Sequence, residues 1–153
     1  MRDLTEDSPK AGDSSLQRRA EEWVIKAYNR ERPPTKQIEK PKDRTTLSEA
    51  AKVDVDAVSH DRSAVYEIYV RQGNLKPGHR RKIAMDALKL VALSGQFRRR
   101  VLLFADPLIE AELVKDTTWL AHALREAGIE VECVELSRRQ RKQILDAQER
   151  QRR

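Results

Sequence analysis

The chain has 153 residues and a mass of 17.7 kDa, which suits one domain with a hydrophobic core and is too short for two domains of ordinary size. Its net charge is +6, but residues 138–153 carry seven Lys or Arg against two acids, so the rest of the chain is almost neutral. No stretch is apolar for long enough to cross a membrane and the first residues lack a secretory signal, which predicts a cytoplasmic protein without membrane contact. A single cysteine, Cys133, excludes an internal disulfide.

The first third of the chain predicts one helix and a long irregular connection. Residues 1–14 are polar, which predicts a disordered leader that ends in a helix N-cap. From Leu16 to about Arg30 apolar side chains recur at helical spacing, which predicts the first helix. Residues 32–44 combine three prolines with dense charge, as is typical of an extended linker or loop. Residues 45–52 fit either one capped helical turn or a short edge strand.

Two strands are predicted next, and one face of each carries acids. Apolar and polar residues alternate over 52–59 and over 64–72, and the short polar connection between them predicts an antiparallel hairpin. Asp54 and Asp56 share a face of the first strand, and Glu67, Tyr69 and Arg71 share a face of the second. If these faces coincide, Asp56 and Glu67 converge, and a divalent cation would offset the repulsion between the two carboxylates.

The second half of the chain alternates helices and strands. Apolar spacing predicts a helix over 80–93, a strand over 100–105, a helix from about 108 to 127 and a strand over 129–136. The order helix, hairpin, helix, strand, helix, strand implies an α/β domain with a mixed sheet and helices on its faces. We expect this domain to span residues 15–136, followed by a basic tail over 137–153 that is either a solvated helix or disordered.

The two acids and the element order resemble the PD-(D/E)xK nuclease superfamily, whose members have the restriction-endonuclease-like fold. The matching segments are DVDAVS, which contains Asp56, and VYEIYV, which contains Glu67 eleven residues further on. The resemblance implies an endonuclease that hydrolyses DNA phosphodiester bonds with Mg²⁺ or Mn²⁺, with Asp56 and Glu67 as the metal ligands. In some members of the family the first helix adds a ligand, here Glu21 or Glu22, although an exposed helical glutamate is the commoner explanation.

One position departs from the family pattern. The family has Lys two residues after the second acid, and this sequence has Tyr69 there. A phenol can donate a hydrogen bond to water or phosphate, but it supplies no fixed positive charge. The resemblance includes members in which the lysine has moved to the neighbouring helix, so we expect Lys82 first, and Lys76 second, to replace it.

Basic side chains beside the predicted site are expected to bind phosphate groups of nucleic acid, DNA in preference to RNA, and these are Arg71, Arg80 and Arg81. Three alternatives stay open. The acids could form an ordinary solvent-exposed face of the hairpin, opposite Lys or Arg. The chain could be a catalytically inactive nucleic-acid-binding module of the same fold, or a partner-binding subunit of a DNA-processing or defence complex. A homodimer or a larger protein complex is compatible with its small size.

Overall fold

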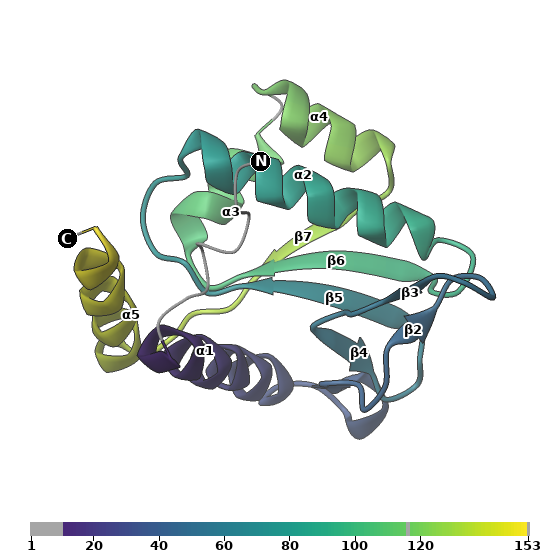
Figure 1. The fold of residues 1–153 in the computed structure, drawn as a ribbon, viewed down its shortest axis with the longest axis horizontal. Helices are drawn as coiled ribbons and strands as arrows, with labels where there is room; N and C mark the ends of the chain where they lie inside the picture. The colour runs from purple at the N-terminus through teal and green to yellow at the C-terminus, as the bar shows by residue number, and fades with distance from the viewer. Residues whose placement is uncertain (1–10, 116, 153) are drawn as a thin grey trace, which may run out of the picture.

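The computed structural model describes residues 11–115 and 117–152, with the backbone alone for residues 11–13. Its elements, in chain order, are α1 (Ala11–Asn29), the 3₁₀ helix η1 (Pro34–Lys36), β1 (Ile38–Glu39), β2 (Thr45–Thr46), β3 (Lys52–Val53), β4 (Ala57–Ser59), β5 (Ala64–Tyr69), α2 (Pro77–Ala92), β6 (Arg99–Phe104), α3 (Pro107–Val114), α4 (Trp119–Glu126), β7 (Glu130–Cys133) and α5 (Arg138–Gln151). Helices α1 and α5 cover one face of a central sheet, and α2, α3 and α4 cover the other (Figure 1). The predicted α/β class is confirmed.

The central sheet is mixed and has five strands in the order β1-β4-β5-β6-β7. Strands β1, β4 and β5 form an antiparallel meander, in which Ile38 lies opposite Ser59 and Ala57 lies opposite Tyr66. Strands β5, β6 and β7 then run parallel and are joined by crossovers through α2 and through α3 and α4. The predicted antiparallel hairpin is therefore present as β4 and β5, and β5 lies at the centre of the sheet.

The single strand predicted over residues 52–59 is wrong. Lys52–Val53 pairs with β2 in a separate two-stranded sheet, and the chain joins the central sheet only at Ala57. Asp54 lies at the surface in the gap between the two pieces, where it forms an ion pair with Arg44. Asp54 and Asp56 therefore share no strand face. Aspartate is poorly suited to a continuous strand, and two aspartates at alternate positions divide this one.

The interpretation of residues 32–44 as a linker or loop is also incomplete, because β1 lies within them. The side chain of Asn29, at the end of α1, accepts a hydrogen bond from the N–H of Ile38 (2.8 Å) and donates one to its carbonyl oxygen (2.9 Å). This clamp holds Ile38 in place as the buried residue of β1. Residues 45–52 adopt the edge-strand alternative, with Thr45–Thr46 as β2.

Three helix predictions need correction. The helix α1 begins at Ala11, so the last four residues of the expected disordered leader are helical, while residues 1–10 lie outside the described residues. The long helix predicted over 108–127 is two helices, because the Thr118 hydroxyl caps α4 by accepting a hydrogen bond from the N–H of Ala121 (3.2 Å). Within the expected basic tail, α5 packs against α1 and buries Ile144 and Ala147.

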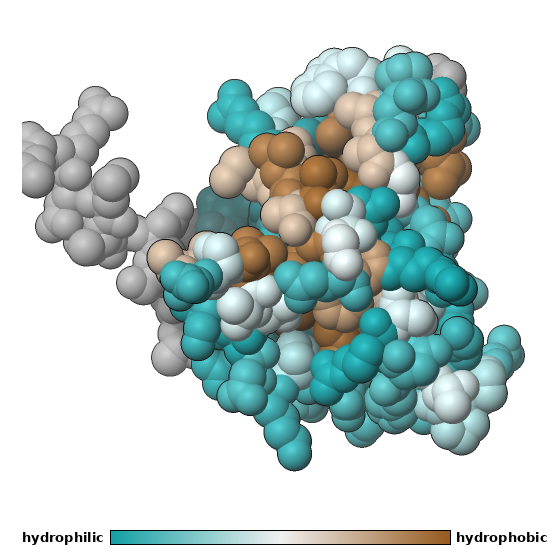
Figure 2. Space-filling model, turned by 90° about the vertical axis from the view of Figure 1, so that its right-hand side faces the viewer, coloured by the Kyte–Doolittle hydropathy of each residue, from teal (hydrophilic) through white to brown (hydrophobic). Residues whose placement is uncertain are grey.

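Two apolar layers hold the sheet between the helices. Tyr66, Val101 and Leu103 point to the layer shared with α1 and α5. Val65 and Leu102 point to the layer shared with α2, α3 and α4. Within the described ranges, no helix has the length and apolar character needed to span a membrane. Figure 2 shows apolar side chains gathered in its upper part, at the level where Figure 1 has α2 and α4. The lower part of the surface in this view is mainly hydrophilic.

Candidate functional site

The candidate site lies where β5 extends beyond the end of β4. The pairing of Ala57 with Tyr66 places Asp56, the residue before β4, opposite Glu67 on the same face of the sheet. The side chain of Asp56 takes the place of a neighbouring strand here, because the N–H of Ile68 donates a hydrogen bond to Asp56 Oδ2 (2.8 Å). The structure therefore brings the two acids singled out by the sequence together.

Glu67 is a buried acid in a strand that is otherwise apolar along its central part. Its residue surface is 3% exposed, and it faces the apolar layer under α2. Burial raises the pKa of Glu67 to about 9, and a hydrogen bond with Asp56 and the negative charge of Asp56 act in the same direction. In the absence of a cation the Asp56–Glu67 pair therefore retains a proton near neutral pH.

Lys89 of α2 supplies the positive charge beside this pair. Its ammonium Nζ lies 2.7 Å from Glu67 Oε1 and 3.8 Å from Asp86 Oδ1. The pKa of Lys89 is raised, because contact with Glu67 and the nearby acids outweighs the effect of burial, which is the largest single cause and acts in the opposite direction. A fixed ammonium thus contacts the second acid, although the position two residues after Glu67 is a tyrosine.

Tyr69 contributes to the site through Asp86. Its hydroxyl donates a hydrogen bond to Asp86 Oδ2 (2.5 Å), and its ring stacks on Phe104 with the ring centroids 4.9 Å apart. Burial raises the pKa of Tyr69, and the contact with Asp86 raises it further, so the phenol stays protonated. A chain of contacts therefore runs from Tyr69 through Asp86 and Lys89 to Glu67.

The two lysines expected to replace the motif lysine do not contact either acid of the pair. Lys82 Nζ lies 5.8 Å from the centroid of the Tyr69 ring, and its charge acts on Glu21. Lys76 is exposed and is the N-cap residue of α2, where its backbone N–H donates a hydrogen bond to His79 Nδ1 (3.0 Å). Lys89, which the sequence analysis did not single out, contacts Glu67 instead.

The three arginines expected to bind phosphate lie in different surroundings. Arg71 follows β5 and lines the cavities at the end of this strand. Arg80 forms an ion pair with Glu112 of α3, which occupies its guanidinium. Arg81 is exposed on α2 near the side chain of Trp119. Of the three, Arg71 lies next to the strand that carries Glu67.

Glu21 of α1 lies within electrostatic reach of the pair. Its pKa is raised, mainly by burial and then by the negative charge of Asp56. Glu22, the other candidate on this helix, is exposed. Among the described residues no three His, Cys, Asp or Glu side chains converge closely enough to form a metal-binding group.

The donor atoms of Asp56 and Glu67 fit a small, hard divalent cation. Mg²⁺ and Mn²⁺ prefer carboxylate oxygens, and Mg²⁺ is commonly held by one or two carboxylates while water and substrate phosphate fill its other positions. The hydrogen bonds from Ile68 and Lys89 engage one oxygen of each carboxyl group, and a cation would replace the proton in the hydrogen bond between Asp56 and Glu67. With the cation bound, both carboxyl groups would be ionised. Their proximity disfavours this state when no cation is present.

Comparisons with known protein families, with curated proteins and with solved structures found no match to this chain. The chemistry of the site is therefore argued from its own groups. Two adjacent carboxyl groups and a fixed ammonium form an arrangement that can hold a divalent cation and place a positive charge beside a bound anion.

Proposed function

We propose that this chain is a Mg²⁺- or Mn²⁺-dependent DNA endonuclease with a restriction-endonuclease-like fold. One observation carries the proposal: Asp56 and Glu67 meet where β5 runs past β4, and the Lys89 ammonium lies 2.7 Å from Glu67. These are the two acids and the amine of the PD-(D/E)xK pattern, with the amine supplied by α2. Tyr69 stands in the usual position of the lysine, and its hydroxyl donates a hydrogen bond to Asp86, which forms an ion pair with Lys89.

The arrangement of the elements supports the fold part of the proposal. A helix leads into a three-stranded antiparallel meander, and a second helix then leads to a strand parallel to the last strand of the meander. This is the order that the resemblance implies for the nuclease superfamily. Glu67 lies on the last strand of the meander and Asp56 directly before the middle strand, and the resemblance implies metal-binding acids in this meander.

Each residue of the site has a role in the proposed hydrolysis. When bound, Mg²⁺ would neutralise charge on the phosphodiester and lower the pKa of a water molecule. Asp56 and Glu67 would hold the cation. Lys89 hydrogen-bonds the attacking water or a phosphate oxygen and offsets the negative charge that develops at phosphorus. The water oxygen forms the new bond to phosphorus and releases a proton to solvent. The bond from phosphorus to one ester oxygen breaks, and that oxygen takes a proton from solvent and leaves as a hydroxyl.

The test is cleavage of supercoiled plasmid DNA by the purified chain, with Mg²⁺, with Mn²⁺ and with a chelator. We expect nicking that needs the cation and that falls at least about 100-fold in Asp56→Asn and in Glu67→Gln, because each change removes a charged ligand. Asp54→Asn is the matched control, since Asp54 is two residues away but is exposed and paired with Arg44. Cleavage that survives both site substitutions would show that the site is elsewhere.

Two other functions are distinguished by the same preparation. An inactive nucleic-acid-binding module would bind DNA with salt-sensitive affinity and never cut it. A partner-binding subunit is favoured by the exposed apolar side chains Met85 and Leu88 on α2 and Trp119 on α4, which are 67%, 66% and 77% exposed. That function would give no DNA binding at low salt and would give association measurable by light scattering.

A further inference from the structure

Beyond Tyr69, β5 ends at a cavity of about 110 Å³ whose charged side chains are all basic. Arg71 from the end of the strand and His79 and Lys82 from the first turns of α2 line it, together with Gln17 of α1. The cavity also borders the Tyr69 ring, so it lies next to the Asp56–Glu67 pair along the same strand. No acidic side chain lines it within the part of the chain that the structure describes.

The basic groups around the cavity act on one another. The pKa of His79 is lowered by burial first, and then by the positive charges of Arg71, Lys76 and Lys82. The pKa of Arg71 is lowered by burial and by the charge of Arg152. In the described ranges no ion pair joins an acid to any of the basic residues Arg71, Lys76, His79 and Lys82. Lys82 nevertheless lies close enough to Glu21 for its charge to lower the pKa of that acid. Gathering cations in this way is unfavourable unless an anion binds among them.

The guanidinium of Arg71 has an unused donor. Its Nε is buried and has no hydrogen-bond partner among the described residues. A buried N–H without an acceptor costs free energy, so such a group in a folded protein is commonly explained by a missing ligand, ion or water. His79 accepts the Lys76 N–H at Nδ1, which leaves its Nε2 as the nitrogen that carries a proton and can donate to an anion.

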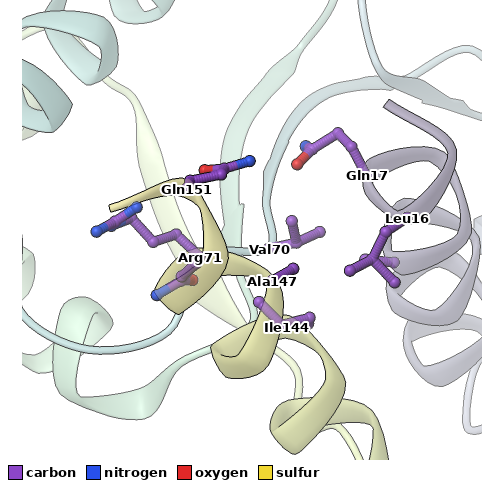
Figure 3. A pocket seen from close by; sticks show the side chains of 9 residues that line it. Leu16, Gln17, Val70, Arg71, Ile144, Ala147 and Gln151 are labelled. Carbon is purple, nitrogen blue, oxygen red and sulfur yellow. The ribbon is translucent and has the colours of Figure 1, made fainter. Parts of the chain in front are cut away.

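The backbone that follows Arg71 is held by hydrogen bonds. Gln72 and Gln148 of α5 form two hydrogen bonds, from the Gln72 N–H to Gln148 Oε1 and from Gln148 Nε2 to the Gln72 carbonyl, each 2.9 Å. Gly73 then turns with φ +89°, and its N–H donates to the buried Asp106 (2.7 Å). Arg71 lies beside Gln151 at the end of α5, across a second cavity from α1 (Figure 3).

We propose that Arg71, His79 and Lys82 form a subsite for one phosphate group of a nucleic acid. The planar fork of Arg71 suits two phosphate oxygens, and Lys82 and the imidazole N–H of His79 supply further donors. The positive end of α2, whose first turn holds His79, adds to the attraction. The subsite lies next to the Asp56–Glu67 pair, so it would bind a phosphate near the one that is cut. This part of the inference rests on the proposed function. Helix α5 positions Arg71 through Gln148.

Two sources of phosphate have this chemistry, namely the terminal 5′-phosphate of a strand and an internal phosphodiester. Both present oxygens to the same donors, so the subsite is defined by the phosphate and not by a base. Duplexes with a 5′-phosphate and with a 5′-hydroxyl separate the two sources. A terminal phosphate is the ligand if the hydroxyl form binds more weakly. An internal phosphodiester is the ligand if the two bind equally and a single methylphosphonate near the cut lowers the affinity.

The direct test is calorimetric titration of the metal-free wild-type chain with inorganic phosphate at low salt. We expect Arg71→Gln to weaken phosphate binding roughly tenfold, because it removes a charge-assisted pair of hydrogen bonds, and Arg71→Lys to weaken it less. Arg98→Gln is the matched control, since Arg98 is exposed at the start of β6, at the opposite end of the parallel strands. We expect it to change phosphate binding by less than about twofold.

The outcomes separate this subsite from the proposed nuclease activity. Loss of phosphate binding in Arg71→Gln, with its circular dichroism unchanged, supports the subsite even if the wild-type chain cuts no DNA. The subsite is wrong if Arg71→Gln binds phosphate as the wild type does, or if Arg98→Gln loses as much affinity. If DNA is cut with the same KM by wild type and Arg71→Gln, the nuclease activity stands and the subsite falls.

Discussion

Glu67 is the residue on which the site depends. Among the acids whose side chains the structure describes it is the most deeply buried, and it faces the carboxyl group of Asp56 and the ammonium of Lys89. One ammonium cannot balance two ionised carboxylates, so the three groups together retain a proton. The divalent cation that we propose would supply the missing positive charge and replace that proton.

We predict that the stability of the metal-free chain falls as pH rises. The pKa of Glu67 is 4.5 when unfolded and about 9 when folded, so over this interval the native state holds a proton that the unfolded chain has lost. The contribution of Glu67 is therefore fully present below about pH 4.5 and is lost as pH rises towards about 9. Urea midpoints measured in chelator should fall less over this range for Glu67→Gln, which cannot ionise. Parallel curves for the two proteins would contradict the assignment.

Lys89 and Lys82 lie on the same side of α2 but should have separable effects. Lys89 contacts Glu67, whereas Lys82 lines the basic cavity. We predict that Lys89→Gln lowers kcat for DNA cleavage at least about 100-fold, because it removes charge at the reacting phosphate. Lys82→Gln should instead raise KM with a smaller change in kcat. Steady-state kinetics on a short duplex checks this, and equal loss of kcat in both variants would contradict it.

The crossover from β5 through α2 explains why Lys89, and not Lys82, contacts Glu67. In a right-handed crossover the helix runs back along the strand that precedes it. Residues later in α2 therefore lie over residues earlier in β5, so Lys89 meets Glu67 and Asp86 meets Tyr69. Lys82 is closer to Glu67 in the sequence, but it lies towards the end of β5 that follows Tyr69. The spacing of Lys82, Asp86 and Lys89 along one side of a helix was the signal that could have found the site.

Other elements show where local sequence patterns are sufficient. The alternation in β5 and the short connection before it predicted the hairpin, and the hairpin register brings Asp56 opposite Glu67. Strand β1 could not be predicted, because it has two residues and is fixed by the distant side chain of Asn29. The packing of α5 depends on a contact with α1 across the whole sequence, which residue spacing within the tail does not reveal.

The basic segment at the end of the chain has a structural role as well as its charge. Ile144 is 4% exposed between α5 and the layer under α1, whereas the neighbouring Leu145 is 48% exposed. We predict that Ile144→Ala lowers the free energy of unfolding by about 2–4 kcal/mol, and that Leu145→Ala lowers it by less than about 1 kcal/mol. Urea denaturation of both variants checks the difference. Equal small losses would show that α5 does not contribute to the core.

The whole molecule separates its charges in a way that the net value of +6 does not show. The acids Asp56 and Glu67 meet at the edge of β5, and the basic cavity follows directly along the same strand. Under the proposed function, this juxtaposition would place one phosphate of a nucleic acid at the cation site and a neighbouring phosphate at the basic cavity. The exposed apolar side chains of α2 and α4 lie apart from this line and are available for contact with another protein.

A calorimetric titration of the purified chain with Mn²⁺ at neutral pH tests whether Asp56 and Glu67 hold a cation. We predict that the wild-type chain binds one equivalent, and that Glu67→Gln loses most of this binding because it removes one of the two charged ligands. Asp54→Asn, which changes an exposed acid outside the pair, should bind Mn²⁺ as the wild type does. A wild-type chain that binds no Mn²⁺, or a Glu67→Gln variant that binds it equally well, would contradict the assignment of this site.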